Sequence, residues 1–175
     1  LILDATCAPA DIRYPTDLGL LNQARKQTEK IIDILYDRLE EKPNEKPITQ
    51  RIIAKKEYLK IAKKRRVTKK QRRKAIKKQL QYINRNLGHI ERLQTSGAKL
   101  EWLNNQQYKM LLVVATVYQQ QLSMYENKQQ RVDDRIVSLT QPHMRPIERG
   151  KAGTPVEFGA KLSVSYHNGY VYIDQ

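Results

Sequence analysis

The sequence predicts an α+β protein in which a long helical insertion separates a first strand from a later strand pair. Three observations predict this fold class. The chain opens on Leu-Ile-Leu-Asp, an aliphatic run that ends in an acid. Apolar residues then recur at helical spacing over 17–129, and from 156 onward they alternate with polar residues. The expected segments are a first strand within 1–16, a helical insertion over 17–131 and a sheet hairpin within 132–175.

The first strand is notable for the acid that it carries. Three aliphatic residues lead into Asp4, and a Pro15-Thr16-Asp17 helix start follows a run of small residues. A carboxylate held on a rigid strand is a candidate ligand for a hard cation such as Mg²⁺. The residues leave open a simpler interpretation, in which Asp4 only caps a turn at the end of a strand.

Two helices are expected in the first part of the insertion. Thr16 or Asp17 is expected to cap a helix over 17–41, because its side chain can accept free backbone N–H groups. The prolines of 42–47 end this helix, since proline lacks a backbone donor. Thr49 is expected to cap a short second helix that ends near Lys64.

Two longer helices are expected to follow as an antiparallel pair. Thr68 and Gln71 have the spacing of a capping box, and Gly97 is suited to the left-handed end of the helix that they open. The next helix is expected over 99–129. Apolar side chains predict the packed faces of the two helices: Ile76, Leu80, Ile83, Leu87 and Ile90 on the first, and Leu103, Met110, Leu111, Val114, Tyr118, Leu122 and Tyr125 on the second.

The last quarter of the chain predicts strands. Residues 156–166 alternate between apolar and polar, Asn168 and Gly169 form a strong hairpin-turn signal, and 170–173 return as the second strand. The Asp4 strand is expected to lie beside this hairpin. A further short strand is expected over 135–139.

The charge balance is strongly basic. The 175 residues include 33 Lys and Arg against 18 Asp and Glu, which gives a net charge of +15 and a pI of about 9.9. Such an excess predicts a polyanionic partner, most often nucleic acid, with a membrane surface as the competing interpretation. No apolar run approaches the ~20 residues of a membrane-spanning helix. The single cysteine, Cys7, excludes an internal disulfide and fits a reducing cytoplasm.

The positive charge is densest over 55–78. Cations this close repel one another, so phosphates of nucleic acid are the expected partners, and a solvated helix face is the alternative. Few aromatic residues interleave the segment, so backbone contacts with little base readout are expected. The candidate DNA-binding residues here are Lys63, Lys64, Arg65, Arg66, Lys69, Lys70, Arg72, Arg73, Lys77 and Lys78. Arg149 and Lys151, in a basic turn around Gly150, are further candidates, with an ordinary loop as the equal alternative.

Two blocks of sequence, in the right order, resemble one protein family. The first block is the opening LILDATCAPADIRYPTD, and the second is made up of residues 135–147 (RIVSLTQPHMRPI) and 149–165 (RGKAGTPVEFGAKLSVS). Both blocks are similar to the DDE transposases of bacterial insertion sequences. The similarity extends over almost the whole chain and is weakest in the charged middle.

The resemblance implies a ribonuclease H-like fold and an enzyme that cuts and joins double-stranded DNA at element ends and target. In that family three carboxylates hold two metal ions, Mg²⁺ or Mn²⁺, and Asp4 matches the first carboxylate by position. The second and third carboxylates are not found in this sequence, so the chain is expected to be a fragment that is inactive alone. The intact enzyme is expected to work as a homo-oligomer.

Two other functions stay open. The chain is alternatively a non-enzymatic basic helical module that binds nucleic acid, or an inert remnant of a mobile element. His89, His143 and His167 lack metal-ligand spacing, so zinc is not expected.

Overall fold

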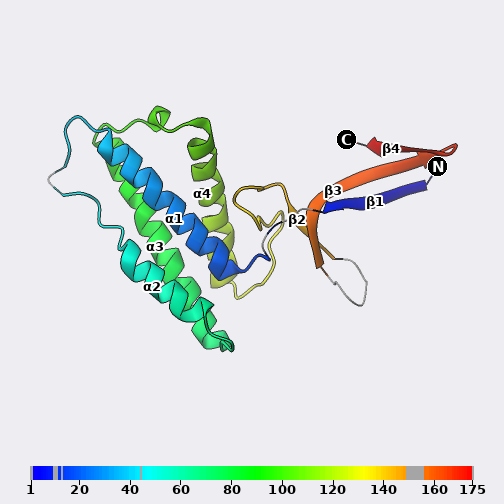
Figure 1. Cartoon of the computed structure of the whole chain (residues 1–175), viewed down its shortest axis with the longest axis horizontal. Helices are drawn as coiled ribbons and strands as arrows, with labels where there is room; N and C mark the ends of the chain where they lie inside the picture. The colour runs from blue at the N-terminus through cyan, green and yellow to red at the C-terminus, as the bar shows by residue number, and fades with distance from the viewer. Residues whose placement is uncertain (1, 10–11, 13, 44, 149–155, 175) are drawn as a thin grey trace. The chain divides into compact units, whose positions relative to one another are not determined.

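The computed structural model describes residues 2–9, 12, 14–43, 45–148 and 156–174 (Figure 1). It is an α+β structure, as predicted. The chain divides into two compact units: residues 16–132, which are helical, and residues 1–15 with 133–175, which hold the sheet.

The helical unit contains four α-helices and one short 3-10 turn within the described residues. They are α1 (Asp17–Asp37), α2 (Arg51–Ala62), α3 (Lys69–Thr95), the turn Leu100–Trp102 and α4 (Asn105–Glu126). No helix among the described residues combines the length and hydropathy that a membrane span requires.

The helix starts follow from side-chain caps. Thr16 caps α1, with its Oγ1 accepting from the Gly19 N–H at 3.1 Å, and Asp17 places a negative charge at the positive end of the helix dipole. The predicted capping box of α3 is present: the Thr68 side chain accepts from the Gln71 N–H at 3.2 Å, and the Gln71 side chain accepts from the Thr68 N–H. Both predicted caps are confirmed.

Two expectations about helix ends were wrong. Thr49 does not cap α2; Gln50 occupies the cap position at a φ of 52° and makes no side-chain cap bond. The Thr49 hydroxyl instead accepts from Arg51 Nε at 3.2 Å. The helix predicted over 99–129 is interrupted, because Asn104 and Gln107 form a second capping box that starts α4 at residue 105.

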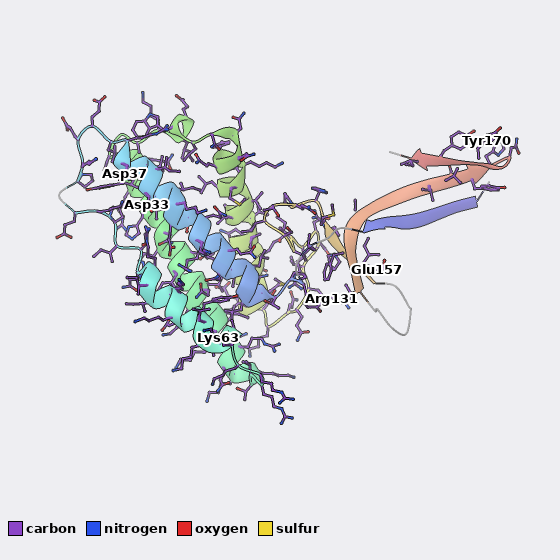
Figure 2. The ribbon with its side chains drawn as sticks, viewed as in Figure 1. Asp33, Asp37, Lys63, Arg131, Glu157 and Tyr170 are labelled. Carbon is purple, nitrogen blue, oxygen red and sulfur yellow. The ribbon has the colours of Figure 1, made fainter. Side chains whose placement is uncertain are left out.

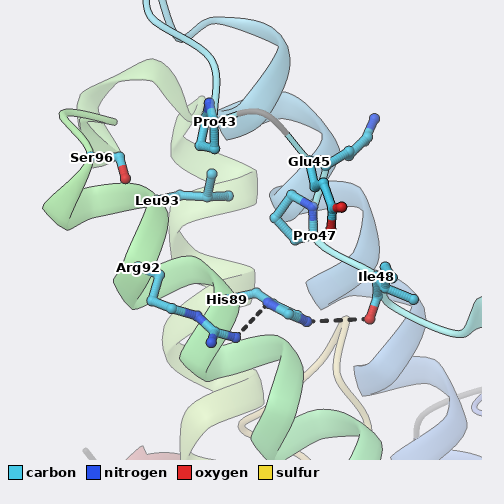
Figure 3. Close-up of a pocket in the computed structure, with 9 residues that line it drawn as sticks. Pro43, Glu45, Pro47, Ile48, His89, Arg92, Leu93 and Ser96 are labelled. Carbon is cyan, nitrogen blue, oxygen red and sulfur yellow. Dashed lines mark hydrogen bonds between the residues drawn. The ribbon is translucent and has the colours of Figure 1, made fainter.

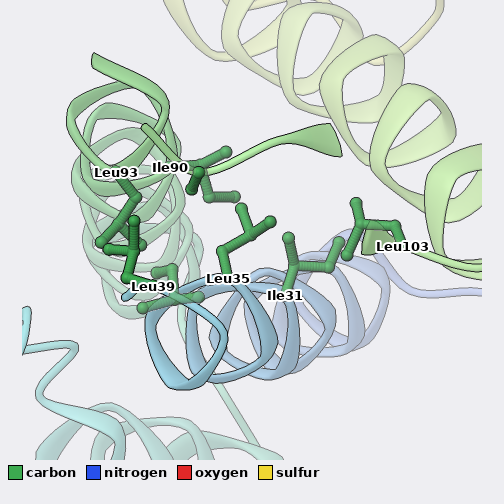
Figure 4. Packing of buried hydrophobic residues seen from close by; sticks show 8 residues of the cluster. Ile31, Leu35, Leu39, Ile90, Leu93 and Leu103 are labelled. Carbon is green, nitrogen blue, oxygen red and sulfur yellow. The ribbon is translucent and has the colours of Figure 1, made fainter. Parts of the chain in front are cut away.

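The core of the helical unit lies where α1, α3 and α4 pack together, so the predicted helix pair is part of a larger bundle. One cluster joins the end of α1 to the end of α3 and the following turn; its buried members are Ile31, Ile32, Leu35, Leu39, Ile90, Leu93, Ala98 and Leu103 (Figure 4). On α4, Val113, Val117 and Met124 are buried beside the predicted Val114 and Tyr118. The buried face of α4 is therefore rotated from the predicted one.

The sheet unit is organised around one long strand. Strand β3 (Val156–His167) pairs antiparallel with β1 (Ile2–Pro9), with β2 (Arg145–Glu148) and with β4 (Tyr170–Asp174). The register places Asp4 opposite Val164. Asn168 and Gly169 have φ angles of 49° and 86°, as a two-residue hairpin turn requires, so the predicted hairpin and its neighbouring Asp4 strand are confirmed.

The strand predicted over 135–139 is absent. Those residues form no regular strand, and the additional strand is β2, which begins ten residues after the start of the predicted strand. Pro146 in the middle of β2 made this strand hard to predict. Among the described residues β2 pairs only with β3, so proline leaves no ladder donor missing on a second side of the strand.

Candidate nucleic-acid interface

Helices α2 and α3 form an antiparallel hairpin; its tip is the connection 63–68 together with the first turns of α3, through Lys77. Residues later in α3 contact residues earlier in the sequence, in or just before the first turn of α2, as an antiparallel arrangement requires. The Gln79 side chain donates to the Ala54 carbonyl at 3.3 Å, and the Arg85 guanidinium donates to the Thr49 carbonyl at 3.0 Å. Ala54 is fully buried. Its small side chain lets the two helices approach closely at this point.

A three-residue cluster fastens the hairpin near its tip. Glu57 of α2 accepts a hydrogen bond from the Lys78 ammonium and a second, at 2.7 Å, from the Tyr82 hydroxyl. Burial would raise the pKa of Glu57, but the bonds from Lys78 and Tyr82 outweigh it and hold that pKa below its ordinary value. Burial and the bond to Glu57 raise the pKa of Tyr82 to about 12.

A second set of ion pairs fixes the segment that leads into the hairpin. Asp33 of α1 binds the Arg51 guanidinium at 2.9 Å and the Lys46 ammonium at 3.1 Å. Burial acts to raise the pKa of Asp33, and the two cations overcome it and lower that pKa. In Figure 2, Asp33 and Asp37 lie near the far end of the bundle from Lys63.

The hairpin region carries all of the net charge of the chain. Residues 51–90 contain sixteen Lys and Arg and one acid, Glu57, whereas the rest of the chain contains seventeen residues of each sign. Since Glu57 is already bound by Lys78 and Tyr82, it does not offset the other cations of the tip. The positive charge is therefore concentrated on one helix pair.

Most of the predicted DNA-binding residues are exposed at this tip. Figure 2 shows the side chains around Lys63 spreading outward from the end of the hairpin. The exposed members of the predicted set are Lys63, Lys64, Arg65, Arg66, Lys69, Lys70, Arg72 and Lys77. These eight cations are available to one extended anion.

Two members of the predicted set have partners inside the bundle. The Arg73 guanidinium lies 3.9 Å from the centre of the Tyr125 ring, a cation–π contact between α3 and α4. Lys78 is the partner of Glu57. Both side chains are half-buried, and both contacts fasten one helix to another. We therefore leave Arg73 and Lys78 out of the candidate interface.

The remaining predicted site residues are not brought into this interface by the described structure. Arg149 and Lys151 lie outside the described residues. The Asp4 backbone is described as part of β1, but its side chain is not. Within the described residues no three His, Cys, Asp or Glu side chains are grouped to hold a metal ion. The expectation of Mg²⁺ or Mn²⁺ at Asp4 therefore stays a prediction.

A pocket of about 400 Å³ lies at the other end of α3, beside the segment that precedes α2 (Figure 3). His89 contacts the Ile48 carbonyl through Nε2 at 3.2 Å, and its Nδ1 lies 2.7 Å from the Arg92 guanidinium. Because Arg92 has only donors, this pairing fits a neutral ring that accepts at Nδ1. Burial first, and then the nearby Arg92 and Arg85, lower the pKa of His89. His89 therefore links the segment before α2 to helix α3 through these two contacts.

The residues that fasten the hairpin were not predicted from the sequence. Glu57 is the one acid between Glu45 and Glu91, and a lone acid in a basic segment is a signal that could have identified it. The Arg73–Tyr125 contact joins residues far apart in the sequence, so no local pattern indicates it.

Comparisons of this chain with protein-family models, curated proteins and solved structures found no match.

Proposed function

We propose that this chain binds double-stranded DNA through the exposed cations at the tip of the α2–α3 hairpin. The observation that carries the proposal is the location of the charge: the net charge of +15 belongs to residues 51–90, and nine of its cations, the eight named above and Lys74, are exposed at the tip. Duplex DNA presents a regular row of negative charges at close spacing, which matches such a concentration of cations.

The physical chemistry favours contact with the DNA backbone. Each phosphate that Lys or Arg neutralises releases condensed counterions, so affinity falls as salt rises, with a slope of roughly −0.9 per contact. Phosphate contacts position a protein without reading sequence, and the tip cations offer contacts of this kind.

A charge-reversal pair tests the proposal. Arg65→Glu with Arg66→Glu replaces two exposed tip cations, and Lys26→Glu with Lys30→Glu makes the same charge change on the exposed side of α1. Binding of a fluorescent duplex, followed by anisotropy at fixed salt, should weaken far more for the tip variant. Equal weakening in both variants would mean that only net charge matters, and an undetectable wild-type affinity would end the proposal.

We also propose that the DNA-binding hairpin belongs to a DDE transposase, in which Asp4 is the first catalytic carboxylate. What supports this second proposal, beside the sequence resemblance, is the strand arrangement. Strand β1 lies on one edge of β3 while β4 lies on the other, so Asp4 is on a strand adjacent to an antiparallel hairpin. The resemblance implies that the first three strands of the catalytic sheet pair in this way.

The catalytic proposal has its own test. Asp4→Asn in a full-length protein that cleaves DNA should abolish strand cleavage and leave duplex affinity nearly unchanged, because the residue would act on the reacting phosphate rather than on the bound backbone. The exposed acid Glu101 supplies a control, as Glu101→Gln. Cleavage that survives Asp4→Asn would contradict the catalytic role and leave the DNA-binding proposal intact.

A further inference from the structure

An exposed strip on α3 continues the basic tip along the helix. Its members follow one another at spacings of four and three residues, so they share one face: Lys70, Lys74, Lys77, Gln81, Asn84 and Gly88. The first five are exposed and Gly88 is partly exposed, although α3 packs against α1, α2 and α4 on its other sides. We call this set the α3 strip.

The strip changes chemistry along its length. Its first three members are lysines at the tip, and the next two are the amides Gln81 and Asn84. Arg92, which is exposed one turn after Gly88, places a cation at the far end. Within the described part of the chain, the side chains of Gln81 and Asn84 have no hydrogen-bond partner, so their donors and acceptors face solvent.

Gly88 has no role in packing that the structure reveals. A Cβ built at this position meets nothing within 4 Å. Glycine weakens the interior of a helix because it loses the most backbone freedom on folding. A bare backbone on an open helix face is what close approach of another molecule requires. The glycine therefore points to a partner that contacts this face.

The partner with the matching chemistry is duplex DNA seated with its major groove over the strip. The uncharged part from Gln81 to Gly88 is about 10 Å long at 1.5 Å per residue, close to the roughly 12 Å width of the major groove. Lys77 and Arg92 then flank that part, as the two rows of phosphates flank the groove. Amide side chains are suited to base edges, because Gln and Asn can pair with N6 and N7 of adenine.

We infer that the α3 strip is a sequence-reading surface for duplex DNA, in which Gln81 and Asn84 contact base edges and Gly88 permits close approach. This inference rests on the proposed DNA-binding function. It goes further than contact with the backbone, because it assigns specificity to side chains outside the basic tip.

The experiment selects duplexes from a pool with a randomised centre, using the whole chain, and sequences the bound fraction. Wild-type chain should enrich a preferred sequence. The variant Gln81→Ala with Asn84→Ala should lose roughly 5- to 150-fold discrimination for each base pair that it reads, while the salt dependence of its affinity stays unchanged because no cation is lost. The control, Gln23→Ala with Gln119→Ala, removes exposed amides from α1 and α4 and should keep the preference.

Gly88→Ala separates an interface from a structural role. Alanine should raise the melting temperature of the free chain, because it favours helix and meets open space. The same change should lower affinity for the selected duplex, by about tenfold, and Gly88→Gln should lower it further. A stabilised variant that binds the selected duplex as tightly as wild type would remove Gly88 from the interface.

The outcomes distinguish the two claims. If the wild-type chain binds no duplex, the proposed function fails. If it binds duplex in a salt-dependent way but enriches no sequence, or keeps its preference in the amide variant, only the present inference fails. Binding to duplex RNA that drops equally in the strip variants would also overturn it, because the major groove of RNA is too deep and narrow for a helix.

Discussion

Arginine occupies two opposite environments in the helical unit, the buried interface of α1 and the exposed tip of the α2–α3 hairpin. Arg25 is 2% exposed; its guanidinium pairs with Glu29, one turn later, and donates to Asn22 Oδ1 at 2.8 Å. Arg65 and Arg66 at the tip are exposed. Glu57, the one acid within residues 51–90, accepts hydrogen bonds from Lys78 and Tyr82 instead.

The difference between the two environments shows which charged side chains stabilise the folded chain. A buried cation must have its anion inside the protein, since an unpaired buried charge is very unfavourable. An exposed cation is solvated and needs no internal partner, so a large excess of such cations reports on an external anion. Substitution of a charged residue should therefore reveal whether its charge stabilises the fold or serves an external anion.

The largest effect is expected at the buried pair. Arg25→Ala leaves the Glu29 carboxylate buried without its cation, so the free energy of unfolding should fall by about 3–5 kcal/mol. Urea denaturation of the variant measures this loss. Lys26→Ala, at the neighbouring exposed position, is the matched control and should change stability by less than about 0.5 kcal/mol. A loss at Arg25 no larger than that of the control would contradict the division.

The tip should behave in the opposite way. Replacing Arg65, Arg66 and Lys69 together by alanine removes three exposed cations and no internal contact that the structure shows, so the free energy of unfolding should change by less than about 1 kcal/mol. Duplex affinity should fall, and the slope of log affinity against log salt should become shallower by roughly 2–3. A variant that is destabilised while its salt slope is unchanged would make these cations structural.

The Glu57 cluster should give an intermediate effect, because it is only partly buried. Glu57→Gln removes the charge that Lys78 and Tyr82 bind, and we expect a loss of about 1–2 kcal/mol. Chemical denaturation measures it, and Glu126→Gln, at an exposed position of α4, is the control. Stability equal to wild type would show that Glu57 does not fasten the hairpin.

The same cluster predicts two pH effects of opposite direction. The pKa of Glu57 is lowered, so its contribution to stability is present above the ordinary carboxyl pKa and is lost as pH falls through the folded value. The pKa of Tyr82 is raised to about 12, so its contribution is present below pH 10.0 and is lost as pH rises from there toward 12. Tyr82→Phe should flatten the alkaline loss, which urea denaturation across pH would reveal.

The smallest effect is expected at the Asp33 ion pairs, which remain accessible to solvent. Asp33→Asn should lower the free energy of unfolding by no more than about 1 kcal/mol, because such pairs are screened by water and salt. The loss should shrink as salt is added. A loss that salt leaves unchanged would mean that Asp33 contributes through packing rather than through charge.

Local chemistry explains which parts of the fold were predictable. Thr68 with Gln71 and Asn168 with Gly169 are short-range signals, and both gave the expected cap and turn. The Asn104 capping box uses the same chemistry but falls within an apolar pattern that continues on both sides, so the interruption of the helix was missed.

Non-local packing explains the rest. Arg25 and Glu29 are one turn apart, a spacing that is equally common for exposed ion pairs, so their burial depends on how α1 meets its neighbours. For the candidate interface, the sequence identified the basic residues. It did not show which of them are exposed and which contact other side chains of the bundle. Only the contacts of Arg73 with Tyr125 and of Lys78 with Glu57 make that distinction.

The most direct test of the central claim is the salt dependence of duplex binding by the wild-type chain. If the exposed tip cations neutralise phosphates, six or more contacts predict a slope of about −5 or steeper in log affinity against log salt. A slope near zero, or affinity that is insensitive to salt, would contradict the claim that the charge of residues 51–90 serves an external polyanion.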